Sequence, residues 1–480
     1  MRDKGSAKGR RTKRGLTTVL MGTVVGLAML VGVGAGQGCA EKAPAPIAPT
    51  PVVVGVSLGL TGGLEAFAGP LRNAVRSAEG QINAAGGVLG RPIVFDIVDD
   101  KSDEDSIVAS VASDFVRKRV VAVIGPIGSQ QVVKTQDIYA KAHIPQITPS
   151  ATSTDLSTIQ PTSDRWLFRT TPADDFQGAA VLLFARKGPA GLSADGGAPG
   201  DGGAGGGCNK MAIVNIENAY GNSMADVIEK NFPKQAGASV VIREKVQVKL
   251  EADYTASVNK VIATSPQCLA LIAYDDVAAQ FVRDFKASPK YTSLQQAGFF
   301  FIGTDGVFTS GFLQRGRSNP SDPMSENQAD GVYGTNPDTQ PNTPEYNQFR
   351  TIYASYFPLG NAPDAPAFTA NIFDAAVMIA LAIQSAGNTD GAAIRDALLK
   401  VAAPPGSPVT PAALLEGFQK IQQKEDIDYK GGSGAVDLES NGNVKAGFIV
   451  WQAVRDPGTK LTDYKTVGRF SLDELVQVLK

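Results

Sequence analysis

The chain has 480 residues, of which 43% are hydrophobic and 19% are charged. This length exceeds what one hydrophobic core usually fills, and the composition excludes large-scale disorder. The formal net charge of −2 combines about +6 in residues 1–38 with about −8 in the remainder, which argues against a nucleic-acid partner.

The N-terminus has the pattern of an export signal. Residues 1–14 are basic and residues 15–38 form an uncharged apolar stretch, so we predict a signal peptide over 1–38. Small residues before Cys39, followed by a Pro/Ala-rich segment, resemble a bacterial lipoprotein signal with Cys39 lipidated and 39–51 as the tether. An uncleaved membrane anchor is the alternative, because the apolar stretch is long enough to span a bilayer. Either way, we expect the folded part outside the cytoplasmic membrane.

From residue 51 the sequence alternates strands and helices. We expect strands at 52–60, 93–98 and 120–124, a helix with Pro70 in its first turn, and a helix at 106–119. The strand at 52–60 is rich in Val and Leu, as parallel strands buried on both faces are. Repeated units of this kind predict a parallel sheet with right-handed crossovers.

The same alternation is then repeated. Strands are expected at 211–214, 240–243, 269–273 and 299–302, and helices at 222–235, 254–264 and 366–386. Two runs of this pattern predict two α/β lobes. Between the runs, residues 187–207 are about half glycine and are predicted to be a surface insertion. Residues 402–427 also lie outside the repeated pattern.

Cys208 and Cys268 each lie just before a strand of the second run. In a doubly wound sheet these first and third strands are parallel neighbours, so both cysteines come to one end of the sheet within bridging reach. We predict a disulfide, which export permits. Two unpaired thiols are the alternative.

Hydroxyl side chains follow two strands of the first run. Ser129 follows the strand at 120–124, and Ser150 and Thr152 follow the strand at 144–148. Two parallel strands joined by a helix bring both turns to one sheet edge, where open α/β proteins bind ligands. Helix capping or turn formation is the alternative use of these residues.

Ordered segments across the chain resemble the type I periplasmic binding proteins of the branched-chain amino acid transporter class, and in particular Leu/Ile/Val-binding-protein-like lipoproteins. The segments that carry the resemblance include IGPIGSQ, IPQITPSATSTDL, FRTTPADDFQG, AIVNIENAYGNSMAD, FFFIGTDGVF and GAVDLESNGNVKAGFIVWQ. The resemblance implies two doubly wound parallel-sheet lobes joined by a three-crossing hinge, with a ligand held between them. Lobe I would comprise 52–170 and 337–444, and lobe II 171–336 and 445–480.

The resemblance also assigns ligand-binding residues. Ser129 would bind a ligand carboxylate, Ser150 would receive the amino group through its carbonyl, and Thr152 would contact both ends. Asp305 would be the acidic partner of the amino group, with a simple Asp-Gly turn as the alternative. The aromatic positions around the ligand would be Phe67, Tyr220, Tyr274 and Phe368. This set suits a zwitterion, because a buried carboxylate needs several donors and a buried ammonium needs a carboxylate.

Catalytic chemistry is not expected. His143 is the only histidine, no cluster has metal-ligand spacing, and no GxxxxGK loop is present. We therefore predict no catalytic residue, no cofactor and no metal site. The expected function is a monomeric, lipid-anchored solute-binding protein of the cell envelope that passes an amino acid or a related amide or carboxylate to an ABC permease. An envelope sensor or regulatory protein acting through a protein partner is the alternative.

Overall fold

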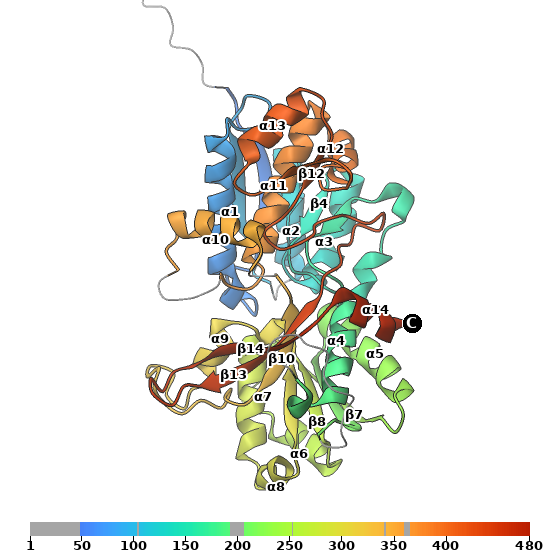
Figure 1. Cartoon of the computed structure of the whole chain (residues 1–480), viewed down its shortest axis with the longest axis vertical. Coiled ribbons are helices and arrows are strands. Elements are labelled where there is room, and N and C mark those ends of the chain that lie inside the picture. Colours follow the sequence, from blue (N-terminus) through green and yellow to red (C-terminus); the bar gives the residue numbers. More distant parts are fainter. Residues whose placement is uncertain (1–48, 103–104, 193–205, 252, 340–341, 360–364) are drawn as a thin grey trace, which may run out of the picture. The chain divides into compact units, whose positions relative to one another are not determined.

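The computed structural model describes residues 49–102, 105–192, 206–251, 253–339, 342–359 and 365–480. The expected signal peptide at 1–38, Cys39, most of the tether and most of the insertion at 187–207 lie outside the described residues. The described residues form two large sheets, and Figure 1 shows helices grouped around each of them. We call the lobe around the first sheet lobe I and the lobe around the second sheet lobe II.

The sheet of lobe I has five parallel strands in the order β2–β1–β3–β4–β5. The strands are β1 (Val52–Leu58), β2 (Ile93–Asp99), β3 (Val123–Ile124), β4 (Gln146–Thr148) and β5 (Leu167–Arg169). The helices of this lobe are α1 (Glu65–Ala84), α2 (Asp105–Lys118), α3 (Ser129–Lys141), α10 (Pro344–Tyr356), α11 (Thr369–Ala386), α12 (Gly391–Leu398) and α13 (Leu414–Gln422). This strand order is a doubly wound one, in which ligands bind outside the carboxyl ends of the strands.

The sheet of lobe II has seven strands in the order β14–β13–β10–β9–β8–β6–β7. The strands are β6 (Lys210–Ile216), β7 (Ser239–Val246), β8 (Cys268–Ile272), β9 (Phe300–Gly303), β10 (Tyr333–Pro337), β13 (Phe448–Arg455) and β14 (Thr462–Phe470). The helices are α4 (Asp174–Lys187), α5 (Ala219–Asn231), α6 (Thr255–Ala263), α7 (Asp275–Ala287), α8 (Tyr291–Gln296), α9 (Ser310–Arg315) and α14 (Leu472–Leu479). The first five strands in chain order are parallel and repeat the order of lobe I.

The last two strands of lobe II depart from the parallel sheet expected from the sequence. β13 pairs antiparallel with both β10 and β14, so the sheet is mixed. The connection from β13 to β14 is a tight turn in which Asp456 Oδ1 accepts from the amides of Gly458 (3.0 Å) and Thr459 (2.6 Å). So short a connection can join only antiparallel strands.

The chain passes between the two lobes three times: after β5, after β10 and before β13. The three passages contact one another. Arg169 Nε donates to Asn443 Oδ1 at 2.8 Å, and the Asp338 amide donates to the Gly447 carbonyl at 2.9 Å. The passages therefore support one another as a hinge.

Three helices begin at positions that differ from the sequence prediction, and one of them, α5, begins at Ala219 rather than at residue 222. α1 begins at Glu65, so placing Pro70 in its first turn was wrong. A proline this near the helix start removes only one hydrogen bond, and the apolar face of the helix, which includes Leu71 and Ile82, is buried. α11 begins at Thr369 rather than at residue 366, because Phe368 has φ 60°, outside the helical region.

α11 is the only described helix that is long and apolar enough to span a bilayer, and 83% of that stretch is buried in the protein. It is therefore the core helix of lobe I. The segment 402–427 packs against this core and is not a free insertion. Its strand β11 (Ser407–Val409) pairs in parallel with β12 (Ile427–Tyr429), and Leu414 and Phe418 of α13 are buried in the same apolar cluster as α11.

The two cysteines of lobe II are joined. β6 and β8 are parallel neighbours with Met211 opposite Cys268, which brings Cys208 to the same sheet end. Cys208 and Cys268 form a disulfide with an S–S distance of 2.10 Å and a Cα–Cα distance of 5.8 Å.

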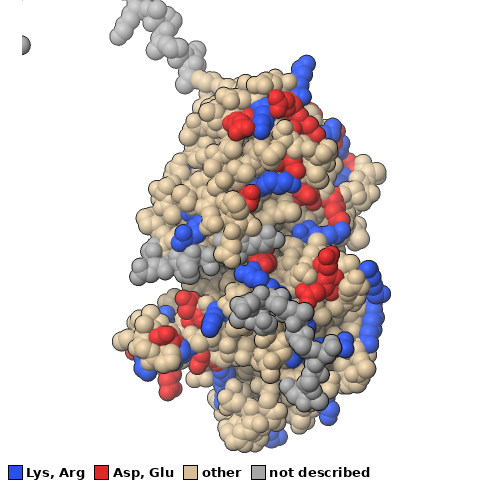
Figure 2. Space-filling view, viewed as in Figure 1, with Lys and Arg blue, Asp and Glu red and all other residues tan. Residues whose placement is uncertain are grey.

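The surface is mixed in charge: on the face shown in Figure 2, basic and acidic side chains are interspersed among uncharged ones.

Candidate ligand-binding site

A cavity lies between the lobes at the carboxyl ends of their parallel strands, and the empty space between its atoms, counted together with space open to solvent, is about 340 Å³. Ligands of open α/β proteins bind at this end of the strands. The residues that line it are Leu64, Phe67, Ile127, Gly128, Ser129, Ser150 and Phe368 of lobe I and Tyr220, Tyr274, Asp305 and Gly306 of lobe II. Seven of the eight ligand-binding residues predicted from the sequence are thus brought together, and Thr152 is not among them.

Ser129 is placed as a hydrogen-bond donor to the cavity. Its Oγ accepts the amides of Thr152 (3.2 Å) and Ser153 (3.1 Å). Because a hydroxyl has two lone pairs and one proton, both lone pairs are engaged and the proton is left to point toward another acceptor. Ser129 also opens α3, whose N-cap Gly128 supplies no side-chain cap. Hydroxyl and helix N-terminus together favour an anionic group at this wall.

Ser150 has the opposite hydrogen-bonding role. Its Oγ donates to the Ile127 carbonyl at 2.8 Å, so this hydroxyl offers lone pairs to the cavity rather than a proton. The structure therefore places a donor, Ser129, and an acceptor, Ser150, on the same wall of lobe I. A small zwitterion needs both groups, a donor for its carboxylate and an acceptor for its ammonium group.

Thr152 is not among the residues that line the cavity, and its contact with both ends of the ligand stays a prediction. Its amide is bonded to Ser129 Oγ, and its carbonyl accepts the Asp174 amide at 2.8 Å and Arg169 Nη1 at 3.0 Å. Thr152 is only 1% exposed. Its backbone groups are engaged in holding Ser129 and the hinge, which the sequence could not show.

Asp305 is the acidic group of the cavity. It is 4% exposed, and its Oδ1 accepts the Tyr220 hydroxyl at 2.8 Å. Burial raises the pKa of Asp305 to about 6, and the hydrogen bond from Tyr220 opposes that rise. The carboxyl group is therefore mostly ionised at neutral pH and presents a negative charge to the cavity.

Aromatic rings close the remaining walls. Tyr220 and Tyr274 are stacked, with ring centroids 5.8 Å apart and planes within 5°. Phe67 and Phe368 lie tilted at 6.0 Å on the opposite lobe. The φ of 60° at Phe368 is unusual for a residue other than glycine, and such strain concentrates at functional sites. These rings provide an apolar environment that excludes water.

Gly306 allows the lobe II wall to form. A Cβ atom at this position would lie 2.6 Å from the Ala273 carbonyl oxygen and 3.1 Å from the Tyr220 hydroxyl. Any side chain would displace the wall beside Asp305. The sequence motif GTDG drew attention to Asp305 and not to this glycine.

Arg169 and Asp174, which the sequence did not single out, organise the hinge beneath the cavity. Arg169 is buried, and its Nη1 donates to the carbonyls of Thr152 and Ser153, both at 3.0 Å. Burial lowers the pKa of Arg169 to about 10. It remains charged at neutral pH and fixes the loop that bonds Ser129.

Asp174 is fully buried at the start of α4. Neither of its carboxyl oxygens has a hydrogen-bond partner among the described residues. Burial raises its pKa well above the usual value, and the nearby charge of Asp305 adds to the rise. The hydroxyls of Thr152 and Ser223 and the charge of Arg169 lower it, although neither hydroxyl meets hydrogen-bond geometry.

No group of three metal-ligating side chains occurs in the parts of the chain that the structure describes.

The family of the chain follows from its similarity to known proteins. A family model described as periplasmic binding protein matches residues 51–413. The chain is also 25% identical over 342 residues to the Leu/Ile/Val-binding protein BraC3 of Rhizobium johnstonii, covering 70% of this chain and 87% of that protein.

The chain is a type I periplasmic binding protein of the branched-chain amino acid transporter class. A second relative is the chemotactic signal transduction system substrate-binding protein BasB of Halobacterium salinarum, 23% identical over 88% of this chain and 91% of that one.

Two solved structures share the fold of this binding protein. One is the branched-chain amino acid transporter substrate-binding protein LivJ of Streptococcus pneumoniae in complex with isoleucine, with a TM-score of 0.64, 19% identity and coverage of 87% and 99% of the two chains. The other is a solute-binding protein of R. palustris in complex with 4-hydroxybenzoate, with a TM-score of 0.65, 15% identity and coverage of 88% and 97%.

The protein is a solute-binding protein of the ABC transporter type with an extracytoplasmic location. The family of this chain is a family of binding proteins, and the relatives named above are binding proteins rather than enzymes.

Proposed function

We propose that this binding protein captures an α-amino acid, or a closely related amide or carboxylate, between its lobes and delivers it to an ABC permease. The observation that carries the proposal is the polarity of the cavity. The Ser129 hydroxyl and the start of α3 offer donors on one lobe, and Asp305 offers a negative charge on the other. A zwitterion satisfies both ends at once.

The negative charge separates two ligand classes. A branched-chain amino acid carries an ammonium group that neutralises Asp305, whereas a simple aromatic acid carries none. The Asp305 carboxylate is 4% exposed, and a second uncompensated anion near it would be costly. The cavity is therefore better suited to amino acids than to hydroxybenzoates.

Thermal shift against a panel of amino acids, amides and aromatic acids tests this proposal. Ligand at about a hundred times its Kd stabilises the bound state by about 2.7 kcal/mol, which raises the melting temperature measurably. Asp305→Ala and Ser129→Ala should abolish the shift. Their matched controls are Asp137→Asn, an exposed carboxylate paired with Lys141, and Ser113→Ala, an exposed hydroxyl bonded to the Ala109 carbonyl.

A response to amino acids that survives both site substitutions, or a response to aromatic acids alone, would overturn the proposed ligand class. Absence of any response across the panel favours the sensor or regulatory role, in which the same fold acts through a protein partner. The resemblance to a chemotactic substrate-binding protein keeps that role as the second candidate. Capture of the liganded protein by permease components, but not by signalling receptors, separates transport from sensing.

We further propose that Cys39 carries a lipid that holds the protein at the membrane as a monomer. The support is the sequence pattern around Cys39, which lies a short distance before the first described strand at Val52. Mass spectrometry of protein extracted from membranes should show a diacylglyceryl mass on an N-terminal Cys39 peptide. Cys39→Ser should release the protein from the membrane fraction, and an unmodified Cys39 in an intact chain would reject the anchor.

A further inference from the structure

Hydrogen bonds cross directly from lobe I to lobe II beside the cavity. The Thr154 amide donates to Ser223 Oγ at 2.8 Å, and the two side-chain oxygens lie 3.0 Å apart. Thr154 begins a short helical turn of lobe I (Thr154–Ser157), and Ser223 lies in the first turns of α5 in lobe II. Neither residue lines the cavity, so this pair contacts the opposite lobe and not the ligand.

Both partners are held firmly on their own lobes. On lobe I, Ser153 caps the turn by accepting the Asp155 amide, and Arg169 holds the Ser153 carbonyl at 3.0 Å. On lobe II, Asn218 caps α5 by accepting the Gly221 amide at 2.9 Å. Two rigid groups meeting across a cleft lose little conformational freedom when they bond.

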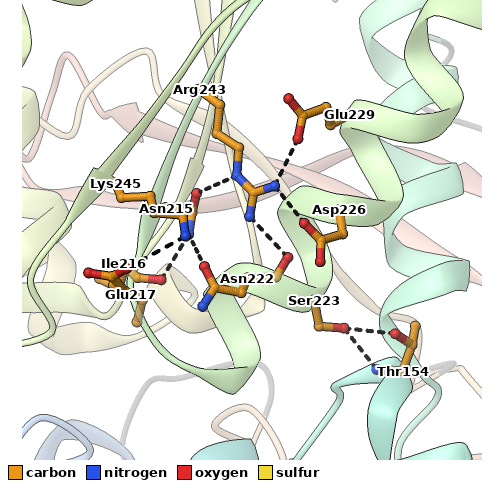
Figure 3. Close-up of polar contacts among 10 residues, drawn as sticks. All are labelled: Thr154, Asn215, Ile216, Glu217, Asn222, Ser223, Asp226, Glu229, Arg243 and Lys245. Atoms are coloured by element: carbon orange, nitrogen blue, oxygen red, sulfur yellow. Dashed lines mark hydrogen bonds and ion pairs between the residues drawn. The ribbon is translucent and has the colours of Figure 1, made fainter.

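Figure 3 shows how α5 is anchored behind Ser223. Arg243 of β7 reaches α5 with one guanidinium nitrogen, which contacts Asp226 at 2.5 Å and Glu229 at 2.8 Å. Its Nε donates to Asn215 of β6 at 3.1 Å, and its Nη2 donates to the Asn222 carbonyl at 3.4 Å. Arg243 thereby ties the helix to two strands, so that the position of Ser223 follows the whole lobe.

A second bond links the same helix to the ligand wall. The Ala219 amide, at the start of α5, donates to Gln130 Oε1 at 3.3 Å, and Gln130 is the neighbour of Ser129 in α3. Helix α5 is therefore in contact with lobe I at two points, one of them adjacent to the donor wall of the cavity. Separating the lobes breaks both contacts.

We propose that the Thr154–Ser223 pair is a latch that forms only when the lobes close and that sets the rate of ligand release. The proposal rests on the proposed function, because it assigns these residues to the closure of that site. A bond made only in the closed state stabilises that state and slows its opening. Because the pair does not touch the ligand, it contributes equally for every ligand that permits closure.

Stopped-flow kinetics with the ligand found in the panel tests the latch. Ser223→Ala removes both bonds, whereas Thr154→Val keeps the Thr154 amide and removes only the hydroxyl pair. At the usual net value of a hydrogen bond, we expect about a thirtyfold faster dissociation for S223A, which loses two bonds, and about a fivefold faster one for T154V, which loses one. Association rates and the melting temperature of the unliganded protein should stay unchanged, and the T154V/S223A double variant should match S223A. Ser113→Ala is the control and should leave dissociation unchanged.

A cross-linking experiment separates failure of the latch from failure of the proposed function. Thr154→Cys combined with Ser223→Cys should form a disulfide under mild oxidation, detected as a linked peptide by mass spectrometry. A linked peptide in a protein that binds no panel ligand would reject the amino-acid ligand and keep the latch. No linked peptide, or unchanged dissociation in S223A when the wild type does bind, would overturn the latch.

Discussion

Replacing Asp305 by asparagine removes the negative charge of the cavity while keeping an oxygen that can accept the Tyr220 hydroxyl. The carboxylate is 4% exposed, so the ammonium group of a bound amino acid would be shielded from water and would depend on this charge. Removing one partner of a buried ion pair costs about 3–5 kcal/mol. Taking the lower end, because Tyr220 and Ser150 supply polar atoms nearby, we expect the affinity to fall by about a hundredfold.

The same residue should make binding depend on pH. Burial raises the pKa of Asp305 to about 6 in the empty cavity, and only the ionised carboxylate can pair with an ammonium group. Affinity should therefore be constant above about pH 7 and should fall by up to tenfold per unit below about pH 6. The groups that face Asp305 do not reverse this sign: Tyr220 has a raised pKa and stays neutral, and protonation of Asp174, whose pKa burial also raises, would only remove further negative charge as the pH falls.

Isothermal titration calorimetry between about pH 5 and about pH 8 measures both effects. Wild-type protein and Asp137→Asn should show the loss of affinity in acid, whereas Asp305→Asn should bind weakly and equally at every pH. If Asp305→Asn binds the ligand as tightly as the wild type, or keeps the acid-sensitive affinity, Asp305 is not the partner of the ammonium group and the ligand must lie in the cavity in a different orientation.

Three further substitutions test the structure around the site. Asp174→Asn should raise the unfolding free energy near pH 8, because asparagine removes the cost of keeping a carboxyl protonated at a fully buried position where its ionised form has no hydrogen-bond partner. Because burial raises the pKa of Asp174 in the folded state, the wild type should lose stability as the pH rises above the ordinary value of 3.8 that the unfolded chain keeps. The difference in unfolding free energy between D174N and the wild type, measured with denaturant, should therefore disappear as the pH falls to that value. Replacing Cys208 and Cys268 together by alanine should lower the unfolding free energy by about 4 kcal/mol, given a sequence separation of 60, and an unchanged midpoint in denaturant would refute a stabilising bridge. Gly306→Ala should weaken ligand binding by about tenfold or more by displacing the wall beside Asp305, whereas Gly69→Ala, with no atom within 4 Å of its Cβ, should bind normally.

The alternation of strands and helices could be read from the sequence because each element buries a regular apolar pattern. The buried apolar face of α1 and the neighbouring positions of β6 and β8 are consistent with such patterns. The antiparallel hairpin of β13 and β14 was not predicted, because its signal is a short turn at Asp456 and not a repeat of the strand–helix unit. Likewise, an apolar periodicity cannot show that Phe368 leaves the helical region and delays the start of α11.

The sequence predicted which residues line the site better than it predicted how those residues interact. Polar residues after strands and the resemblance to the family located Ser129, Ser150 and Asp305, which the structure brings to one cavity. Sequence could not show that Thr152 uses its backbone to hold Ser129, since backbone groups carry no residue-specific signal. It also could not distinguish Asp174 from the many acidic residues that begin helices, because burial depends on how the lobes pack.

A crystal structure of the protein with its bound amino acid tests the orientation of the zwitterion across the two lobes. We expect the ligand carboxylate within hydrogen-bond distance of Ser129 Oγ and the first amides of α3, and the ammonium group beside Asp305. A ligand bound with its carboxylate toward Asp305 would contradict this orientation. A ligand bound elsewhere than in the cavity that Phe67 and Tyr220 line would contradict the site itself.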